Sequence, residues 1–538
     1  MNHPEENMTK PHTPRSDKAP KTPKTAQPAS PFKSAAGKSS PARRQSEGDF
    51  KRDVRAGSKS AGAPRVVPRA EQGAERGENS QLLGKIGTRR SSGAKARGDS
   101  TVVMRGLKPP APSGRRFSGA SQAAGSHPPR FEAPGARVTR RAADRLRSGY
   151  LWVYASDIES VELPAGEAPA LLPVADSRGL LLGTALYSPA SQIALRMVSR
   201  EAIDEAAWLQ LLETRLRAAI ERRKPLLNEL NDACRLCFSE ADELPGLVAD
   251  KYGDLVILQL LARGLNSAAV RETCVRVLRE ELAPAAILER PDARMRELEG
   301  LAAPSPEPLF VRDAAAPAVS TQFHLNGLDF IFDANSGQKT GAFLDQRANY
   351  AATLEWARRL GATGRALDVC CYQGGFALHL AEICGQVTGI DASRASLEVA
   401  ERNYEANRSR LTAQMDWVEG DAFQILRDWS DAGEKFDAIV LDPPAFAKSQ
   451  RAVEGALRGY KELNLRALKM LNPGGMLVTC SCSHHVSWAD LEASVASAAA
   501  DARRRVRLLE RRGAALDHPV VMNLPETEYL KCLVLAVE

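Results

Sequence analysis

Two segments about 110 residues apart hold the side chains of this chain that are best suited to chemistry. Residues 366–376 read ALDVCCYQGGF, an apolar strand that runs into a glycine turn and opens a helix. Residues 479–483 read TCSCS, a strand end with two thiols, and they lie beyond the Leu-Asp-Pro-Pro of residues 441–444. A cofactor-binding turn, an acidic strand end and a cysteine strand end, in this order, suggest methyl transfer from S-adenosylmethionine (SAM) to a base.

The glycine turn and the acids that follow it indicate the kind of cofactor. Gly374 and Gly375 permit close backbone approach, and the next helix presents free N–H groups. The pattern is not Gly-x-Gly-x-x-Gly, which disfavours a dinucleotide. Asp391 ends the next strand, where an acid can bind both ribose hydroxyls. An acid at a strand end is often only a helix N-cap, but Ser393 could provide that cap instead. Asp421 ends the third strand, where a carboxylate could accept from an adenine amino group.

The two thiols at 480 and 482 are expected to differ. Cytosine C5 is a poor nucleophile until a group adds to C6, and a thiolate is the side chain best suited to that addition. Cys480 lies on the strand proper and is expected to be an inert buried residue. Cys482 lies past the strand end, among two serines and two histidines, and we predict that it is the exposed nucleophile. Cys370 and Cys371 are expected to shape the cofactor pocket.

The loop 442–446 reads DPPAF and follows the fourth strand of the sheet. Its prolines fix the backbone and remove hydrogen-bond donors, so the loop is rigid. Such a loop can clamp the edge of a planar base through Pro443 and Pro444 while Phe446 stacks on it. The alternative is a stiff turn with Phe446 in the core.

A dense polar run, DANSGQKTGAFLDQR at 333–347, precedes these elements and leads into a helix. We expect it to wrap a ligand, and SAM to bind where this run, the glycine turn and the acidic strand ends meet. The residues predicted to contact SAM are Lys339, Thr340, Phe343, Asp345, Gln346, Arg347, Asp368, Cys370, Tyr372, Gly374, Gly375, Asp391, Ser393, Asp421 and Asp442. No metal ligand is expected among them.

The elements that must position these residues follow from periodicity. Short apolar runs at 151–154, 170–174, 180–187 and 193–198 predict a small β-barrel. A helix is expected over 202–224, and residues 235–331 mix strands with a helix near 266–282. From about 340, strands and helices alternate, which predicts a doubly wound, mostly parallel sheet with a pair of strands at its end. The fold class is therefore α/β, and ligands bind at the carboxyl ends of such strands.

The charge distribution indicates which partners the chain could have, and the cysteine content indicates its cell compartment. Residues 1–130 carry 26 Lys+Arg against 10 Asp+Glu, and the other 408 residues carry 47 against 56. This basic extension is expected to be disordered and either to bind a polyanion or to act as a solvated linker. The nine cysteines form no disulfide framework, and no signal sequence or membrane span is found, so a cytoplasmic protein is expected.

These residues resemble those of the bacterial 23S rRNA large-subunit methyltransferase I family, which methylates cytosine C5 with SAM. The resemblance covers roughly 135–538. It is carried by Gly337-Gln-Lys-Thr-Gly341, Phe343-Leu-Asp-Gln-Arg347, Asp368, Tyr372-Gln-Gly-Gly-Phe376, Asp442-Pro-Pro-Ala-Phe446, Thr479-Cys-Ser-Cys-Ser483, Asp517-His-Pro519 and Tyr529-Leu-Lys531.

The resemblance implies a PUA RNA-binding domain at 135–200, a central α+β domain at 201–332 and a Rossmann-like SAM methyltransferase domain at 333–538. It places Cys482 at the nucleophile position, with 23S rRNA as the partner. The oligomeric state stays open, a homodimer included. The extension 1–130 lies outside the family pattern.

The chain departs from related enzymes that carry a second thiol after the acidic strand, because Pro444 is followed by alanine. The base that removes the C5 proton is therefore open, and His484 or Asp442 could serve; we predict Asp442 as the second catalytic residue. The Asp-Pro-Pro-x-Phe loop also resembles loops that methylate exocyclic amines without a thiol. An amine methyltransferase, or a non-catalytic RNA-binding or ribosome-assembly factor, remains the alternative.

Overall fold

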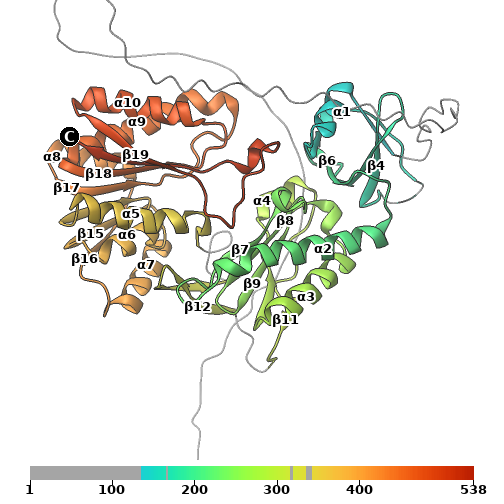
Figure 1. The fold of residues 1–538 in the computed structure, drawn as a ribbon, viewed down its shortest axis with the longest axis horizontal. Helices are drawn as coiled ribbons and strands as arrows, with labels where there is room; N and C mark the ends of the chain where they lie inside the picture. The colour runs from blue at the N-terminus through green and yellow to red at the C-terminus, as the bar shows by residue number, and fades with distance from the viewer. Residues whose placement is uncertain (1–134, 165, 167, 315–318, 335–341) are drawn as a thin grey trace, which may run out of the picture. The chain divides into compact units, whose positions relative to one another are not determined.

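The computed structural model describes residues 135–164, 166, 168–314, 319–334 and 342–538 (Figure 1). The predicted disorder of 1–130 lies outside the described residues and stays a prediction. Lys339 and Thr340 in the polar run also lie outside them.

The N-terminal part is a single sheet of six short strands in the order β2-β6-β5-β4-β1-β3. Its elements are β1 (Ala136–Val138), α1 (Arg140–Arg147), β2 (Trp152–Tyr154), β3 (Ile158–Val161), β4 (Leu171–Asp176), β5 (Leu181–Tyr187) and β6 (Ile193–Ser199). Each of the four predicted apolar runs contains a strand. Helix α1 was not predicted, because its buried residues are only Ala142, Ala143 and Leu146 and they form no apolar run.

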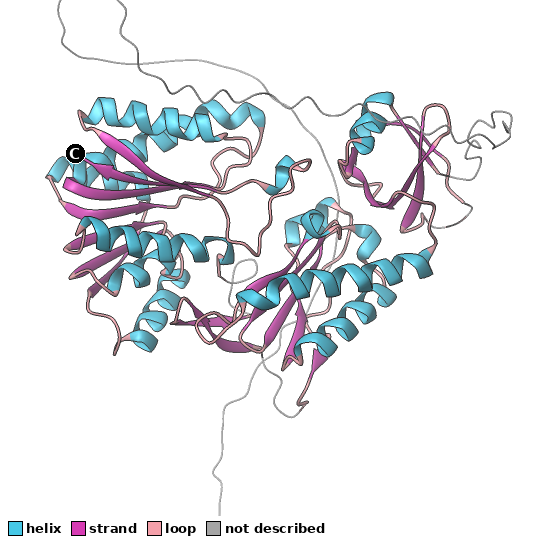
Figure 2. Cartoon of the chain, in the orientation of Figure 1, coloured by secondary structure: helices cyan, strands magenta, loops and turns pink. Residues whose placement is uncertain are grey.

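The central part is a five-stranded sheet in the order β11-β10-β9-β8-β7 with two long helices (Figure 2). Its elements are α2 (Glu205–Arg223), β7 (Cys234–Phe238), β8 (Leu247–Tyr252), β9 (Leu255–Leu260), α3 (Ala268–Leu282), β10 (Ala286–Glu289), α4 (Ala293–Leu298) and β11 (Phe310–Val311). Apolar residues of α2, α3 and the sheet share one buried core. The predicted α+β character is confirmed.

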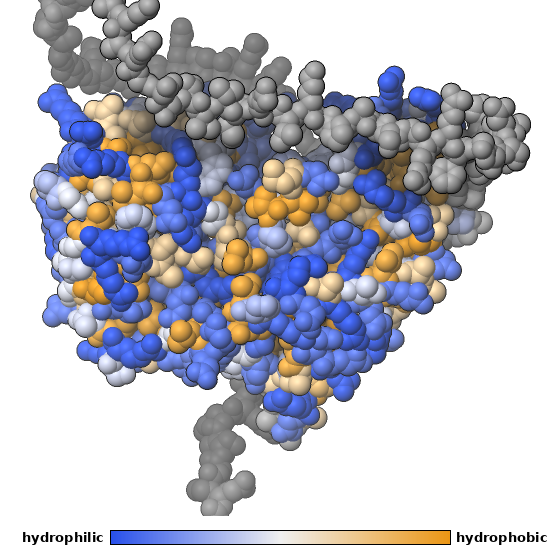
Figure 3. All heavy atoms as spheres, viewed as in Figure 1, coloured by the Kyte–Doolittle hydropathy of each residue, from blue (hydrophilic) through white to orange (hydrophobic). Residues whose placement is uncertain are grey.

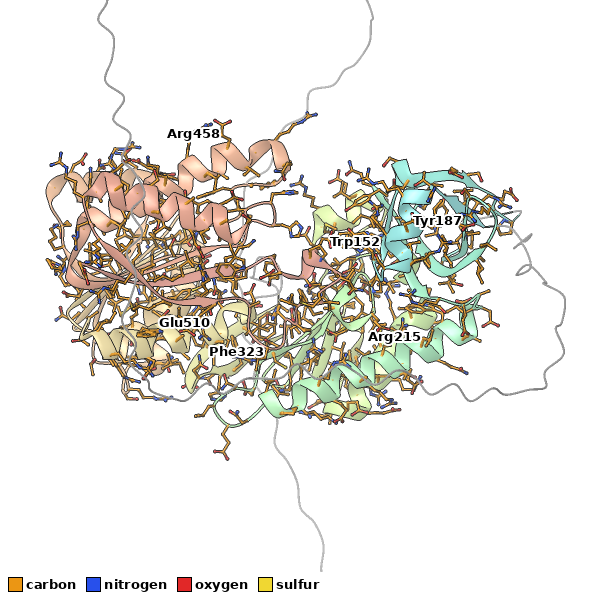
Figure 4. All side chains as sticks on the ribbon, turned by 45° about the horizontal axis from the view of Figure 1, so that its top comes forward. Trp152, Tyr187, Arg215, Phe323, Arg458 and Glu510 are labelled. Carbon is orange, nitrogen blue, oxygen red and sulfur yellow. The ribbon has the colours of Figure 1, made fainter. Side chains whose placement is uncertain are left out.

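A hairpin of β12 (Ser320–Leu325) and β13 (Leu328–Asp333) joins the central part to the C-terminal part. Phe323, labelled in Figure 4, is fully buried, and its ring centroid lies 5.2 Å from that of Tyr252 in β8. On the other side, the Ile331 backbone N–H donates to Asn403 Oδ1 at 2.9 Å. The buried asparagine thus satisfies a strand edge that would otherwise be unpaired.

The C-terminal part is a seven-stranded sheet in the order β16-β15-β14-β17-β18-β20-β19. Its strands are β14 (Arg365–Val369), β15 (Gln386–Asp391), β16 (Gln414–Glu419), β17 (Phe436–Leu441), β18 (Leu471–Ser481), β19 (Val506–Arg512) and β20 (Lys531–Val537). The first five pair in parallel, and β20 runs antiparallel to both of its neighbours. The predicted doubly wound sheet with a terminal strand pair is confirmed.

Helices cover both faces of this sheet (Figures 1 and 2). They are α5 (Arg347–Leu360), α6 (Gly375–Ala381), α7 (Arg394–Asn407), α8 (Ala422–Ala432), α9 (Val453–Met470) and α10 (Trp488–Ala502). One buried core holds Tyr350, Phe376 and Tyr404 from α5, α6 and α7, and the other holds side chains of α8, α9 and α10. The strand order reverses between β14 and β17, and ligands of such folds bind at the carboxyl ends of the strands there.

The visible surface of the described residues mixes hydrophilic and hydrophobic side chains (Figure 3). Within the described ranges, the structure contains no helix with the length and apolar character needed to cross a membrane.

Candidate active site

The predicted nucleophile and the proline loop meet at the ends of two neighbouring strands. Leu441 of β17 is paired with Thr479 of β18, so the residues that follow both strands emerge at one edge of the sheet. The Cys482 thiol donates to the Pro443 carbonyl oxygen with an S···O distance of 3.8 Å. Cys482 is half-buried, whereas Cys480 is fully buried on β18. The predicted burial of Cys480 is confirmed; Cys482 is more accessible than Cys480 but half-buried rather than exposed, and its nucleophilic role stays a prediction.

Asp442, directly after β17, has an unusual electrostatic environment. Its Oδ2 accepts from Gln346 Nε2 at 3.0 Å. Burial of the carboxylate and the negative charge of Asp345 raise its pKa to about 7, and the Gln346 hydrogen bond opposes that rise. A carboxyl group with this pKa exchanges protons near neutral pH.

Asp345 is held by a residue from the far end of the chain. Its Oδ2 accepts from the Tyr529 hydroxyl at 2.5 Å. Its Oδ1 is buried and has no hydrogen-bond partner among the described residues. Phe343 nearby makes an edge contact with the Tyr372 ring, at 5.0 Å between centroids.

The glycine turn after β14 has a constrained backbone. Gly374 has a φ of +86° at the N-cap of α6, and Cys370 and Tyr372 also have positive φ, +63° and +51°. Positive φ is costly for non-glycine residues and tends to occur at functional sites. A Cβ at Gly375 would lie 2.4 Å from the Tyr350 ring, so only glycine fits there.

Asp368 on β14 is buried inside this turn. Its Oδ2 accepts from the Ala377 backbone N–H at 2.8 Å, while its Oδ1 is buried and has no partner among the described residues. Burial, with the charges of Asp442 and Asp391, raises its pKa well above the usual range. Asp368 and Asp345 thus each leave one buried oxygen for a donor or cation.

The acids at the ends of β15 and β16 are tied to backbone groups. Asp391 accepts from the backbone N–H of Tyr372 and of Ser393, both at 2.9 Å. Ser393 caps α7, and Asp421 caps α8 by accepting from Gln424 N at 2.9 Å. Ser393, and not Asp391, therefore caps α7, as the sequence allowed, and the ribose contact of Asp391 and the adenine contact of Asp421 stay predictions.

These acids still converge on the turn. Burial first, and then the charges of Asp391, Asp442, Asp368 and Asp421, raise the pKa of the Cys370 thiol. A small pocket is lined by Phe343, Cys370, Tyr372, Gly375 and Asp442, among others. Its negative surroundings suit a ligand that carries positive charge, such as the sulfonium and amino groups of SAM.

Arg347 makes protein contacts that the sequence did not predict. Its guanidinium is buried, donates to the Ala233 carbonyl oxygen at 2.8 Å and lies 3.5 Å from Asp517 Oδ1. It therefore contacts the central part and the segment after β19, and its cofactor contact stays a prediction.

Asp517, which carried no predicted role, joins the two larger parts of the described chain. It accepts from the Arg235 backbone N–H at 2.9 Å through Oδ2, and its carbonyl oxygen accepts from Arg223 at 3.0 Å. Burial opposes its ionisation, but the His518 hydrogen bond and the Arg347 charge hold its pKa at about 2. The Asp-His-Pro motif was visible in the sequence, but its partners lie too far away in the chain to be predicted.

The loop 443–446 fits the alternative interpretation in part. Phe446 is half-buried, and its ring centroid lies 4.9 Å from that of Tyr460 and 5.8 Å from that of Phe423. Pro444 is exposed and Pro443 is buried. Phe446 therefore packs against the core, as the alternative expected.

Comparisons with known proteins identify two domains in this chain. A family model described as a PUA-like domain matches residues 136–200, and one described as an S-adenosylmethionine-dependent methyltransferase matches residues 310–521. A SAM-dependent methyltransferase structure from Streptococcus mutans has a TM-score of 0.61 and 19% identity, covering 74% of this chain and 99% of that chain. That similarity shows the fold. Fold and site together define a SAM-dependent methyltransferase with a PUA-like domain.

Closer relatives identify the family. Ribosomal RNA large subunit methyltransferase I of Erwinia tasmaniensis is 37% identical over 382 residues, which cover 71% of this chain and 93% of that protein. The protein of the same name from Klebsiella pneumoniae is 37% identical over 388 residues, covering 71% and 92%. This chain belongs to the ribosomal RNA large subunit methyltransferase I family. The predicted family, fold class and SAM cofactor are confirmed.

Proposed function

We propose that this chain forms 5-methylcytosine in 23S rRNA through a covalent bond between Cys482 and C6 of the target base. The contact of the Cys482 thiol with the Pro443 carbonyl, at 3.8 Å, is the main support, because it sets a nucleophile beside an acidic strand end. The rRNA substrate is the one that the names of the relatives print.

Cys482 would act as the thiolate, after its proton passes to solvent. The sulfur forms a bond to C6, and the electron pair of the C5–C6 double bond makes C5 nucleophilic. SAM, when bound, supplies the electrophilic methyl group that C5 accepts. A base then takes the C5 proton, the C5–C6 double bond re-forms, and the S–C6 bond breaks so that the thiolate leaves.

Asp442 is the base that the site favours for the C5 proton. A general base works best when its pKa is close to the operating pH, and burial together with Asp345 raises that of Asp442 to about 7. His484 is the other predicted candidate, and partial desolvation of its ring lowers its pKa. His484 is exposed, and Asp442 lies directly before the proline loop that contacts the thiol.

The buried oxygens Asp345 Oδ1 and Asp368 Oδ1 are candidates for holding the charged end of SAM, because neither has another partner among the described residues. Asp391 would fix the turn through its bond to the Tyr372 N–H while its ribose contact forms. The remaining predicted contacts, those of Ser393 and Arg347 included, stand as part of this proposal. The boundaries 135–200, 201–332 and 333–538 are proposed for the PUA, central and methyltransferase domains. The PUA domain is proposed to contribute to RNA binding.

The direct test uses the full chain and a 23S rRNA fragment that contains 5-fluorocytosine. Fluorine at C5 cannot leave as a proton, so the Cys482 adduct should be trapped and survive denaturing electrophoresis. Cys482→Ala should abolish both adduct and methyl transfer, and the matched variant Cys480→Ala should retain the adduct. Full turnover by Cys482→Ala would overturn the C5 mechanism in favour of an exocyclic amine. No transfer from labelled SAM to any RNA would instead indicate a non-catalytic RNA-binding factor.

A further inference from the structure

A buried lysine lies under the turn that carries Cys482. Lys531 opens β20, is paired with Ser481 of β18, and is only 3% exposed. Its Nζ donates to the carbonyl oxygens of Ser483 and Tyr529, both at 3.1 Å. The ammonium group is therefore bound to the residue that directly follows the predicted nucleophile.

Such a placement is unfavourable for a charge. Among the described residues, Lys531 forms no ion pair with a carboxylate, and both of its hydrogen-bond partners are neutral carbonyls. Burial lowers its pKa, and the negative charges of Glu528, the Cys482 thiolate and Asp490 oppose that effect. A buried ammonium without a paired carboxylate lowers the stability of the fold, so we expect Lys531 to contribute to something other than stability.

The turn itself has other supports. The Tyr460 hydroxyl lies 2.8 Å from Ser481 Oγ and 3.0 Å from Ser483 Oγ, and Ser483 Oγ also accepts from the Ala447 backbone N–H at 3.2 Å. These bonds hold the turn from the side of α9 without any charge. The contribution of Lys531 can therefore be separated from simple anchoring.

The charge interaction between Lys531 and Cys482 is reciprocal. If the thiolate favours the ammonium, the ammonium favours the thiolate by the same free energy. The hydroxyl groups of Tyr460 and Tyr529 also interact electrostatically with Cys482, and both are uncharged at neutral pH. A thiolate, not a thiol, is the nucleophile in cysteine catalysis.

We propose that Lys531 is a positioning residue, whose buried ammonium holds the 481–483 turn through the Ser483 carbonyl and stabilises the thiolate of Cys482. This inference rests on the proposed nucleophilic role of Cys482. It assigns a function to the last residue of the Tyr-Leu-Lys motif at 529–531.

The test measures the pH dependence of Cys482 alkylation by iodoacetamide in the full chain without RNA, read by tandem mass spectrometry. Lys531→Met should raise the midpoint by about one pH unit, which slows alkylation at neutral pH about tenfold. Lys531→Arg should keep the midpoint close to wild type. Tyr460→Phe, which removes turn hydrogen bonds but no positive charge, is the matched control and should leave the midpoint unchanged.

Lys531→Gln keeps donors for both carbonyls without the charge, and it replaces Lys531→Met if that variant does not fold. A wild-type midpoint in the folded neutral variant would overturn the proposal. Because alkylation needs no RNA, this result is independent of the adduct test. If the wild type forms the adduct but the neutral Lys531 variant keeps the wild-type alkylation midpoint, only the proposed role of Lys531 is refuted. If Cys482→Ala still transfers methyl groups, the proposed function itself is refuted.

Discussion

Gln346 Nε2 donates to Asp442 Oδ2 at 3.0 Å, which joins the residue just before α5 to the acidic end of β17. The side-chain Oε1 of Gln346 in turn accepts from Asn349 Nδ2 at 2.6 Å, and Asn349 Oδ1 accepts from Arg512 Nε at 2.9 Å. This chain fixes the amide orientation, so that Gln346 presents a donor to the carboxylate. Gln346 therefore opposes the effects of burial and of Asp345 on the pKa of Asp442.

Gln346→Met should move the pH dependence of methyl transfer. Loss of the donor raises the pKa of Asp442 further above about 7, and a base acts only when deprotonated. The rising limb of kcat against pH should therefore shift to higher pH by about one unit. Gln386→Leu removes a similar amide–carboxylate contact, to Asp416 at the opposite strand ends, and should leave the limb in place. A limb unmoved in Gln346→Met would exclude Asp442 as the titrating base.

Asp442→Asn should lower the methyltransferase activity and raise the stability of the fold. The folded pKa of about 7 lies above the ordinary 3.8, so the wild type loses stability as pH rises from 4 through 7, where the carboxylate must ionise. Asparagine has no such cost and can still accept from Gln346. At pH 8 the variant should be more stable by on the order of 2–4 kcal/mol, with no difference near pH 4. Urea unfolding at both pH values checks this; lower stability than wild type at pH 8 would contradict the assigned environment.

Gly375→Ala should weaken both cofactor binding and folding. The added Cβ would lie 2.4 Å from the ring of Tyr350, which is 5% exposed and has little room to move. Overpacking of this kind costs about 1–3 kcal/mol. Gly385→Ala is the matched control, because its nearest neighbour there would be the Gly364 carbonyl at an ordinary 3.6 Å. Calorimetry with S-adenosylhomocysteine and thermal unfolding measure the two effects; equal affinity in Gly375→Ala and wild type would remove the turn from the cofactor site.

Local patterns predicted the parts of the site that depend on neighbouring residues in sequence. The alternation of strands and helices placed Asp368, Asp391 and Asp442 at or next to the ends of three adjacent strands, because parallel strands share one carboxyl edge. The end of β18 between Cys480 and Cys482 was predictable for the same reason. Ser393 as a cap was visible from its position before a helix.

Contacts across long stretches of chain could not be predicted this way. Arg347 is adjacent to polar residues in sequence, yet it binds the carbonyl of Ala233, which lies 114 residues earlier. Lys531 and Tyr529 reach the site only because β20 inserts between β18 and β19. Phe446 was expected to stack on a base, and its packing against Tyr460 depends on the position of α9. Tertiary packing decided these side chains, and a single sequence carries no signal for it.

Asp517→Asn should destabilise the chain strongly. The Asp517 carboxylate accepts from Arg235 N and lies beside Arg347, and removing one partner of a buried charged pair costs on the order of 3 kcal/mol. Because its folded pKa of about 2 lies below the ordinary 3.8, this stabilisation is complete above pH 4 and is lost as pH falls toward 2. The difference in the free energy of unfolding between the variant and the wild type, measured with urea, should therefore shrink as the pH falls from 4 toward 2. Asp431→Asn, which breaks the exposed pair with Arg466, should cost less than about 1 kcal/mol at every pH; a similarly small cost for Asp517→Asn would refute the role of this carboxylate.

Deletion of residues 1–130 should reduce RNA affinity without changing sequence preference. The extension carries 26 Lys+Arg against 10 Asp+Glu, and cations that contact phosphates release bound counterions. Each lost contact flattens the slope of log affinity against log salt by about 0.9 for a duplex or about 0.7 for a single strand. Binding of full-length and truncated chains to one rRNA fragment over a salt series measures this slope. A full-length variant with the lysines and arginines of 1–130 replaced by glutamine should behave as the deletion does, because only the charge is removed. Equal slopes for all three proteins would make the extension a passive linker and leave RNA binding to residues 135–538.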